Sequence, residues 1–434
     1  MKKLLLLFVF TIFVFSLYSQ EKKLEESLAR GLYYQLDDDG KRFVKFGFGL
    51  QAWVRYMEFN PGTTDYHGEP IKEDFDMCLR RTYISIMGMF DRFTVFSLLA
   101  MDSQTPQVLI GPFSQKKPEF FFYDTWMSYD IIKNHVSFGY GLNMFNGTSR
   151  YASASSARTL GVDPIVIGVP NLITTEQLGR QMSFFLSGQY KIFDFRLSLA
   201  KPFIADTKFM YNPDNINQQT FEVPNTYPSF KGYFTLQLWD KESYKMPFKN
   251  SSYLGNGRYL NIGFGFDYHP QSTVTISITP DDISETYNDR LHIGADIFYD
   301  SPVGELGALS VYLGAFYFDY GPNYILSYGV MNPFAGALNQ FQQGTGTALH
   351  LESGYVLPLR IQNEHKIQPF IQFTYRNFDA MPEANIHYNS GVNYYFADHF
   401  AKATLQWEYR PVWIPDANKY DFFNMIVFKT QLFF

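Results

Sequence analysis

Residues 424–434 read Asn-Met-Ile-Val-Phe-Lys-Thr-Gln-Leu-Phe-Phe, and this stretch at the end of the chain decides the fold. Successive side chains of a β-strand point to opposite faces. One face of a strand here would carry Ile426, Phe428, Thr430, Leu432 and Phe434. The other would carry Met425, Val427, Lys429, Gln431 and Phe433. One face is thus almost wholly apolar, and a strand of about 9–11 residues with this alternation can cross a bilayer.

The stretch also ends on an aromatic residue. It resembles the closing strand of bacterial outer-membrane β-barrels, in which a terminal Phe and alternating apolar residues form the assembly signal. The resemblance assigns that role to Phe428, Leu432 and Phe434 and implies the barrel-assembly machinery as a partner. The alternative is a final edge strand of a soluble sheet.

The first residues predict a secretion signal. Lys2 and Lys3 precede an apolar run from Leu4 to about Leu17, and Ser19 supplies a small residue for cleavage. We therefore divide the chain into a signal peptide (1–19), a short N-terminal periplasmic segment (20–42) and a barrel domain (43–434). Within the second part, the spacing of Leu24, Leu28 and Leu32 is compatible with a short amphipathic helix.

Composition restricts the class of protein. Aromatic residues make up 19% of the chain, and beyond the leader no apolar run reaches the roughly 18 residues of a spanning helix. The single Cys78 excludes an internal disulfide framework and a cysteine-based zinc site. Removing Lys2 and Lys3 changes the formal net charge from −6 to −8, which gives no support to nucleic-acid binding.

Alternation of the same kind recurs along the whole chain. Val44, Phe46, Phe48, Leu50, Ala52 and Val54 share one face of the first predicted strand, with Lys45, Gln51, Trp53 and Arg55 on the other. Later strands include Phe93–Met101, Gln181–Tyr190, Phe193–Ala200 and Lys366–Phe378. The count is about sixteen, and bacterial barrels have an even number. The sequence therefore predicts an all-β, antiparallel up-and-down transmembrane barrel surrounded by outer-membrane lipid.

Connection lengths give a second criterion, because outer-membrane barrels alternate short periplasmic turns with long external loops. Most predicted connections alternate in this way. Asp240–Arg258 is long where a turn should be short, and Asp379–Ala384 is short where a loop should be long. In sixteen-strand porins the loop after the fifth strand folds into the barrel and narrows the pore. Asn143–Arg180 holds that position, and an ordinary surface loop is the alternative.

Several stretches resemble the Bacteroidetes outer-membrane porins of the phosphate-selective porin O and P family. They are Arg80-Arg81-Thr82-Tyr83-Ile84, Asn146-Gly147-Thr148-Ser149-Arg150-Tyr151, Trp239-Asp240-Lys241-Glu242-Ser243 and Gly294-Ala295-Asp296-Ile297-Phe298-Tyr299-Asp300. The resemblance extends over most of Phe43–Phe434 and implies a homotrimeric diffusion channel that also passes anions such as phosphate. Phosphate selectivity elsewhere depends on a dense ladder of Arg and Lys, whereas the cations here are scattered among acidic residues.

Two sets of side chains are candidates for the pore. The pore-lining and constriction set is Arg55, Arg81, Asp124, Arg150, Arg158, Glu176, Arg180, Arg196, Arg376, Lys402 and Arg410. A possible aromatic slide for sugars consists of Trp53, Tyr83, Trp126, Phe370 and Tyr395. The alternative is that these side chains pack against the loop Asn143–Arg180. We expect no catalytic residues, no metal site and no cofactor.

The sequence therefore predicts a porin, that is, a water-filled outer-membrane channel through which small hydrophilic solutes and ions diffuse. Lumen width would set the size limit and wall charge would bias the ions. A substrate-specific sugar channel is the first alternative. A barrel enzyme such as a lipase or protease is the second, although no phosphate loop or zinc-protease helix motif is present.

Overall fold

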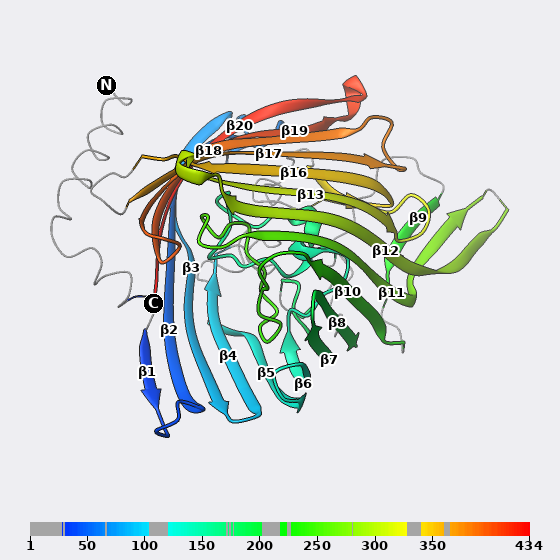
Figure 1. The fold of residues 1–434 in the computed structure, drawn as a ribbon. Coiled ribbons are helices and arrows are strands. Elements are labelled where there is room, and N and C mark those ends of the chain that lie inside the picture. Colours follow the sequence, from blue (N-terminus) through cyan, green and yellow to red (C-terminus); the bar gives the residue numbers. More distant parts are fainter. Residues whose placement is uncertain are drawn as a thin grey trace.

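A computed structural model describes most of the chain after the predicted leader (Figure 1). The described residues are 28, 31–65, 67–103, 120–170, 172, 175–176, 178–201, 218–223, 227–279, 281–327, 340–359 and 365–434. Within these ranges no helix has the length and apolar character needed to cross a membrane. The predicted signal peptide lies outside them.

Sixteen strands form a closed antiparallel barrel, in which the last strand pairs with the first. They are β2 (Arg42–Glu58), β3 (Glu73–Phe90), β4 (Phe93–Asp102), β5 (Phe121–Ile132), β6 (Val136–Asn143), β7 (Gln181–Tyr190), β8 (Phe193–Ala200), β10 (Ser229–Gln237), β11 (Tyr259–Ile278), β12 (Ile283–Pro302), β13 (Ala308–Asp319), β16 (Gly346–Val356), β17 (Lys366–Phe378), β18 (Asn385–Ala397), β19 (Ala401–Ile414) and β20 (Lys419–Phe433). The predicted fold class and strand number are confirmed.

Smaller elements accompany the barrel. Strands β1 (Leu32–Gln35) and β9 (Gln218–Glu222) extend its sheet beside β2 and β11, and β14 (Ile325–Ser327) pairs with β15 (Phe341–Gly344). The described residues also contain four short 3-10 turns, η1 (Arg150–Ser153), η2 (Val166–Gly168), η3 (Gly304–Leu306) and η4 (Pro415–Ala417).

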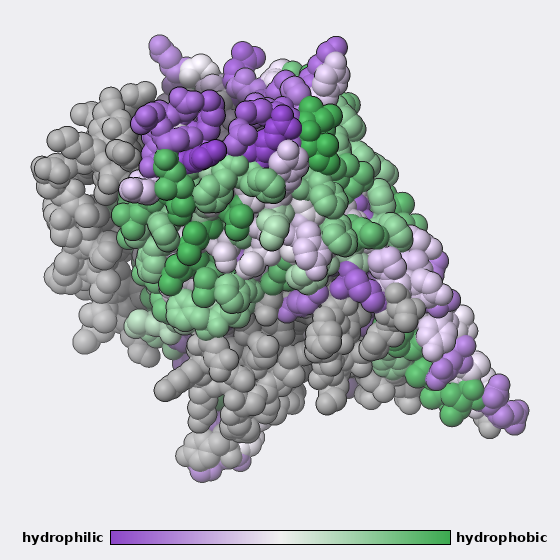
Figure 2. Space-filling view, turned by 90° about the horizontal axis from the view of Figure 1, so that it is seen from below, coloured by the Kyte–Doolittle hydropathy of each residue, from purple (hydrophilic) through white to green (hydrophobic). Residues whose placement is uncertain are grey.

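Side-chain burial follows the alternation of the sequence. On β20, Val427 and Lys429 are fully buried, whereas Ile426 and Leu432 are 40% and 41% exposed. On β2, Trp53 and Arg55 face inward, as predicted. Figure 2 shows a broad patch of apolar side chains below a border of hydrophilic side chains, with further hydrophilic side chains towards the projecting tip. The outer surface is therefore mainly apolar, and the polar residues of each strand line the lumen.

The N-terminal segment completes the sheet at the point where the chain ends. Phe434 and Phe48 exchange two backbone hydrogen bonds of 3.0 Å, and their rings lie 5.6 Å apart. Beyond this pair, Leu32 of β1 lies opposite Phe46, so β1 continues along the edge of β2 that β20 leaves open. Leu32 therefore belongs to a strand, which corrects the expected helical spacing at that residue. Covering an open edge protects it from pairing with another chain.

Deleting Phe434 should lower the amount of folded barrel in the outer membrane, because it removes both backbone hydrogen bonds to Phe48 and the terminal ring. The measurement is the heat-modifiable fraction on a gel at equal expression. Phe434→Tyr keeps the backbone pair and an aromatic ring and should assemble normally. Normal assembly of the deletion would contradict this role.

Candidate functional site

Residues 144–170, which follow β6, lie inside the barrel and are called here the constriction segment (Figure 1). Their backbone carbonyls accept hydrogen bonds from inward-facing side chains on distant strands. Gln51 of β2 donates to Ser156 O at 2.9 Å, and Asn393 of β18 donates to Leu160 O at 2.9 Å. Because β18 lies nearly opposite β6 in the ring of strands, the segment crosses the lumen.

Local sequence explains how the constriction segment fits so close to the wall. A Cβ atom on Gly147 would lie 1.9 Å from the carbonyl oxygen of Phe266, so only glycine can pass this strand. Shortly after it, the hydroxyl of Ser149 accepts from the backbone N–H of Ala152 and caps η1. The Gly-Thr-Ser run therefore brings the chain against β11 and then turns it, which places Arg150 in the interior.

Four charged residues fix the far end of the constriction segment. Arg80 and Arg81 of β3 both contact Asp102 of β4 and Asp163 of the segment. Arg80 Nη2 lies 2.8 Å from Asp163 Oδ2, and Arg81 Nε lies 3.0 Å from Asp102 Oδ2. The two remaining ion pairs, Arg80–Asp102 and Arg81–Asp163, complete the set. Two cations thus face two carboxylates, and the group is nearly neutral overall.

The acid dependence of this attachment follows from Asp163. Burial alone would raise the pKa of its carboxyl, but Arg80 and Arg81 outweigh burial and lower the pKa from 3.8 to about 2. A carboxyl with a lowered pKa in the folded state stabilises that state above its ordinary pKa, and loses this effect as pH falls through the lowered value.

The attachment of the constriction segment should therefore weaken only as pH falls from about 4 towards about 2, and the ion current across the barrel should show an acid step there. The measurement is the current across a planar bilayer that contains the barrel, at a series of pH values. Asp163→Asn removes the titrating group, so this variant should lack the step. A step of equal size in the variant would assign the acid response to another residue.

A second connection also enters the lumen. Residues 238–258, between β10 and β11, include the long "turn" that departed from the expected alternation, and Glu242, Tyr244, Lys249 and Leu254 within it are buried. Arg150 of the constriction segment forms a two-fold hydrogen-bonded ion pair with Glu242, at 2.8 and 2.7 Å. The residues that make this connection unexpectedly long therefore lie inside the barrel.

Most predicted pore-lining residues have buried side chains that face inward. They are Arg55, Arg81, Asp124, Arg150, Arg180, Arg196, Arg376, Lys402 and Arg410, whereas Arg158 and Glu176 are half-buried. Several of the cations already have acidic partners: Arg55 pairs with Asp76, and Arg180 pairs with Asp124 at 3.3 Å. Lys402 instead donates to the carbonyl of Thr159 at 2.7 Å. Sequence reasoning missed Asp102 and Glu242, which complete the two ion-pair groups.

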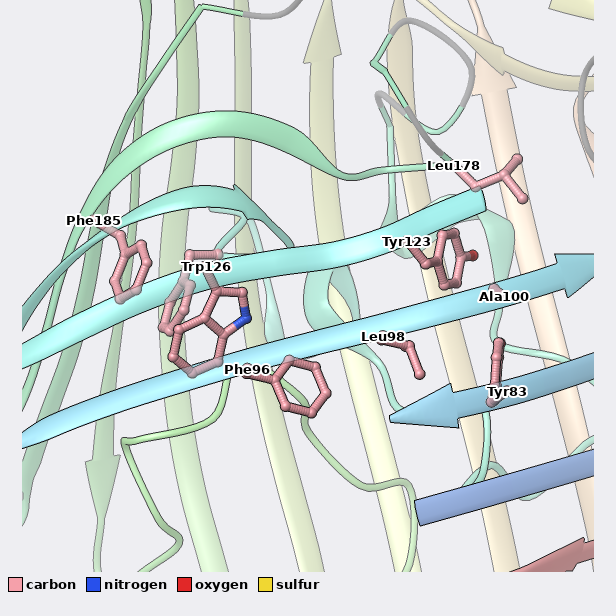
Figure 3. Close-up of a cluster of buried hydrophobic side chains, with 9 residues drawn as sticks. Tyr83, Phe96, Leu98, Ala100, Tyr123, Trp126, Leu178 and Phe185 are labelled. Atoms are coloured by element: carbon pink, nitrogen blue, oxygen red, sulfur yellow. The ribbon is translucent and has the colours of Figure 1, made fainter. Parts of the chain in front are cut away.

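The five residues of the predicted aromatic slide do not form one continuous surface. Tyr83 and Trp126 belong to a cluster on the inner wall that also contains Phe96, Tyr123 and Phe185 (Figure 3). Trp53 packs in a second cluster and Tyr395 in a third. Phe370 is buried on β17, outside all three. A cavity of ≈ 160 Å³ adjoins the first cluster, lined in part by Tyr83, Phe96, Ser156, Arg180 and Phe433.

Several solved structures resemble this chain. The outer-membrane channel DcaP of Acinetobacter baumannii matches with a TM-score of 0.50 at 11% identity, over 92% of this chain and 99% of that one. OmpF of Salmonella typhi, in complex with daunomycin, matches with 0.49 at 9% identity, over 92% and 100%. OprB of Pseudomonas putida matches with 0.49 at 9% identity, over 90% and 94%. No protein-family model and no curated protein matches the sequence.

The chain therefore has the fold of an outer-membrane channel, a closed sixteen-stranded barrel. The likeness to DcaP is one of fold and not of close sequence. Among the residues that the structure describes, no group of three or more His, Cys, Asp or Glu side chains is arranged to hold a metal ion.

Proposed function

We propose that this protein is a porin of the outer membrane, through which small hydrophilic solutes and ions diffuse without a catalytic step. The observation that carries the proposal is the combination of an apolar outer face, a polar and charged inner face, and a segment that crosses the lumen. The constriction segment sets the size limit, and the charges around it bias the ions that enter.

The direction of ion preference depends on charges that lack a carboxylate partner. Arg150 of the constriction segment pairs with Glu242, and Arg180, immediately before β7, pairs with Asp124. The field of each arginine is therefore largely cancelled by that of its carboxylate partner. Lys402 and Lys429 donate instead to neutral carbonyls, those of Thr159 and of Gly161 and Val162. In their protonated form these two lysines favour a weak preference for anions, phosphate included, close to the constriction segment.

At a pH at which both lysines are protonated, replacing them (Lys402→Gln with Lys429→Gln) should raise the cation-to-anion permeability ratio about threefold. A unit charge about 8 Å from a passing ion contributes about 0.5 kcal/mol in water, and salt at physiological strength reduces this roughly threefold. Two charges acting with opposite sign on cations and anions then give about 0.7 kcal/mol. The measurement is the reversal potential across a salt gradient in a planar bilayer.

Lys419→Gln is the matched control, because Lys419 is an exposed lysine at the rim of β20. Its replacement should leave the reversal potential nearly unchanged. If the wild-type barrel passed no current and admitted no solute into liposomes, the proposal of a channel would fail. If the lysine pair and the rim lysine gave equal shifts, the bias would belong to the overall charge of the barrel.

Three parts of the proposal come from the sequence. We expect cleavage after Ser19, recognition of the Phe434-terminated strand by the barrel-assembly machinery, and assembly into a homotrimer. Mass spectrometry of the mature protein from membranes tests the first. Cross-linking of the purified barrel in detergent tests the third, and a monomer as the only product would contradict it.

A sugar channel is the second candidate, favoured by the ≈ 160 Å³ cavity beside the aromatic cluster. The faces of Tyr83 and Phe96 suit the apolar faces of a sugar ring, and Ser85, Ser156 and Arg180 supply hydroxyl and guanidinium groups. This candidate predicts saturable block of the current by an oligosaccharide, lost in Phe96→Ala. If a high concentration of the oligosaccharide left the current unchanged, general diffusion would be favoured over a sugar channel.

A further inference from the structure

The connection 238–258 and the constriction segment enter the lumen from opposite ends of the barrel. The backbone N–H of Gln237, at the end of β10, donates to Ile192 O in the tight turn between β7 and β8 at 2.7 Å. The constriction segment begins at the other end of β7, where Asn143 lies opposite Gln181. A meeting between them therefore joins the two ends of the barrel through its interior.

Backbone hydrogen bonds connect the two segments directly. The N–H of Ser155 donates to Lys249 O and that of Lys249 donates to Ser153 O, both at 2.8 Å. The N–H of Ser251 donates to Arg158 O at 3.0 Å, and Ala154 and Lys249 form a parallel β-bridge. The two segments thus form a short parallel β-contact within the lumen and not merely a side-chain contact.

Glu242 is the centre of the polar contacts at this junction. Its carboxylate accepts hydrogen bonds from both terminal nitrogens of Arg150, from the ammonium of Lys249 at 3.1 Å and from the side-chain amide of Asn261 at 2.9 Å. The Tyr253 hydroxyl also donates to it. Arg150 contributes further hydrogen bonds to Asn250 O at 3.0 and 2.7 Å. Arg150, Glu242 and Lys249 are each at most 5% exposed.

The energetic consequence follows from burial. A buried charge without a partner is strongly unfavourable, whereas a bidentate ion pair with further hydrogen bonds satisfies both groups. Loss of the single carboxylate would leave two cations, those of Arg150 and Lys249, beside each other in the interior. The position of η1 in the lumen therefore depends on a residue contributed from the opposite end.

We propose that Glu242 is a positioning residue of the pore: it holds the constriction segment across the lumen, so that the segments from both ends act as one barrier. The proposal rests on the channel function proposed above. A segment tied at both of its ends and also in its middle fluctuates less than one tied only at its ends. Glu242 thereby sets both the mean width of the pore and the steadiness of its current.

Glu242→Gln tests the proposal, because glutamine keeps the shape of the side chain and removes its charge. The folded variant should show an increase of about twofold or more in single-channel conductance, with added current noise, since a loosened constriction widens the path. Glu305→Gln is the matched control, because Glu305 is exposed in the turn between β12 and β13 at the same end. Wild-type conductance and noise in folded Glu242→Gln would overturn the proposal.

A cysteine pair tests whether a covalent junction can replace Glu242. Ala154→Cys with Lys249→Cys, in a background of Cys78→Ser and Glu242→Gln, replaces the two residues of the parallel β-bridge. The reduced protein lacks the carboxylate of Glu242 and should show raised conductance, and oxidation should return the conductance to the wild-type value reversibly. Failure of the disulfide to form, or equal currents in both states, would overturn the proposal. Because a gel detects the disulfide without any current, failure of the channel function is distinguishable from failure of the junction.

Discussion

Replacing Asp102 with alanine should lower the free energy of unfolding of the barrel by about 3–5 kcal/mol, which is the usual cost of breaking a buried ion pair by removing one partner. Asp102 is fully buried, and Arg80 and Arg81, at 4% and 6% exposed, both contact it. Asp163 would remain as the single carboxylate for two guanidinium groups. Equilibrium unfolding by denaturant in lipid vesicles gives the free energy.

Asp39→Ala provides the matched control for this loss. Asp39 also forms an ion pair, with Lys41 at 2.7 Å, but both side chains are more than half exposed. Exposed ion pairs contribute little to stability, so the control should unfold as the wild type does. If Asp102→Ala unfolded like the control, water would have to compensate the two arginines, and their group would not fix the constriction segment.

The barrel could be predicted from the sequence because its pattern is local. Alternation with a period of two gives both the strand and the face on which each side chain lies. Strands β7, β8 and β17 begin and end at the predicted residues. The alternation in the sequence predicts a strand over Tyr259–Tyr268, whereas β11 continues to Ile278. Between His269 and Thr273 the register shifts and Gln271 has a φ of 45°, so Pro270 interrupts the alternation without ending the strand.

The contents of the lumen were harder to predict, because they depend on contacts between residues far apart in the sequence. The motif containing Arg80 and Arg81 drew attention as a resemblance, yet nothing local indicates that Asp102 and Asp163 are their partners. Glu242 lay in a stretch quoted for its family resemblance and in a connection noted for its unusual length, but neither observation assigned it a partner. That length was the available signal, because a long connection at the end of short turns must go either outward or into the barrel.

Ion pairing also changes the role that we assign to the arginines of the loop Asn143–Arg180. The sequence predicts that Arg150, Arg158 and Arg180 belong to the pore-lining and constriction set, where their charges would bias passing ions. In the structure Arg150 and Arg180 are neutralised by buried carboxylates, and Arg158 is the half-buried member of the three. Arg150 and Arg180 therefore serve mainly to place the segment, and the anion preference proposed above rests instead on the lysines bound to its carbonyls.

On the outer face of the barrel, stability depends on the free energy of contact between side chains and lipid, and not on ion pairs as it does in the lumen. Leu405 of β19 is 42% exposed and lies between Val392 of β18 and Phe428 of β20. Gln406, one residue further, faces the lumen, where its side-chain oxygen accepts from the N–H of Val162 at 2.9 Å. Two adjacent residues of one strand thus face two different environments, lipid for Leu405 and the polar lumen for Gln406.

Leu405→Arg should therefore lower the free energy of unfolding into lipid by about 2–4 kcal/mol if the residue lies near the bilayer midplane. Leu405→Met conserves the apolar contact and is the control. Phe48→Arg should cost less, because Phe48 pairs with the terminal Phe434 at the end of the closing strand and the penalty falls towards the interfaces. Gln406→Arg should instead alter conductance through its contact with Val162. Equal losses of stability at 405 and 406 would mean that alternation does not separate lipid from lumen, and the assignment of the two faces would have to be abandoned.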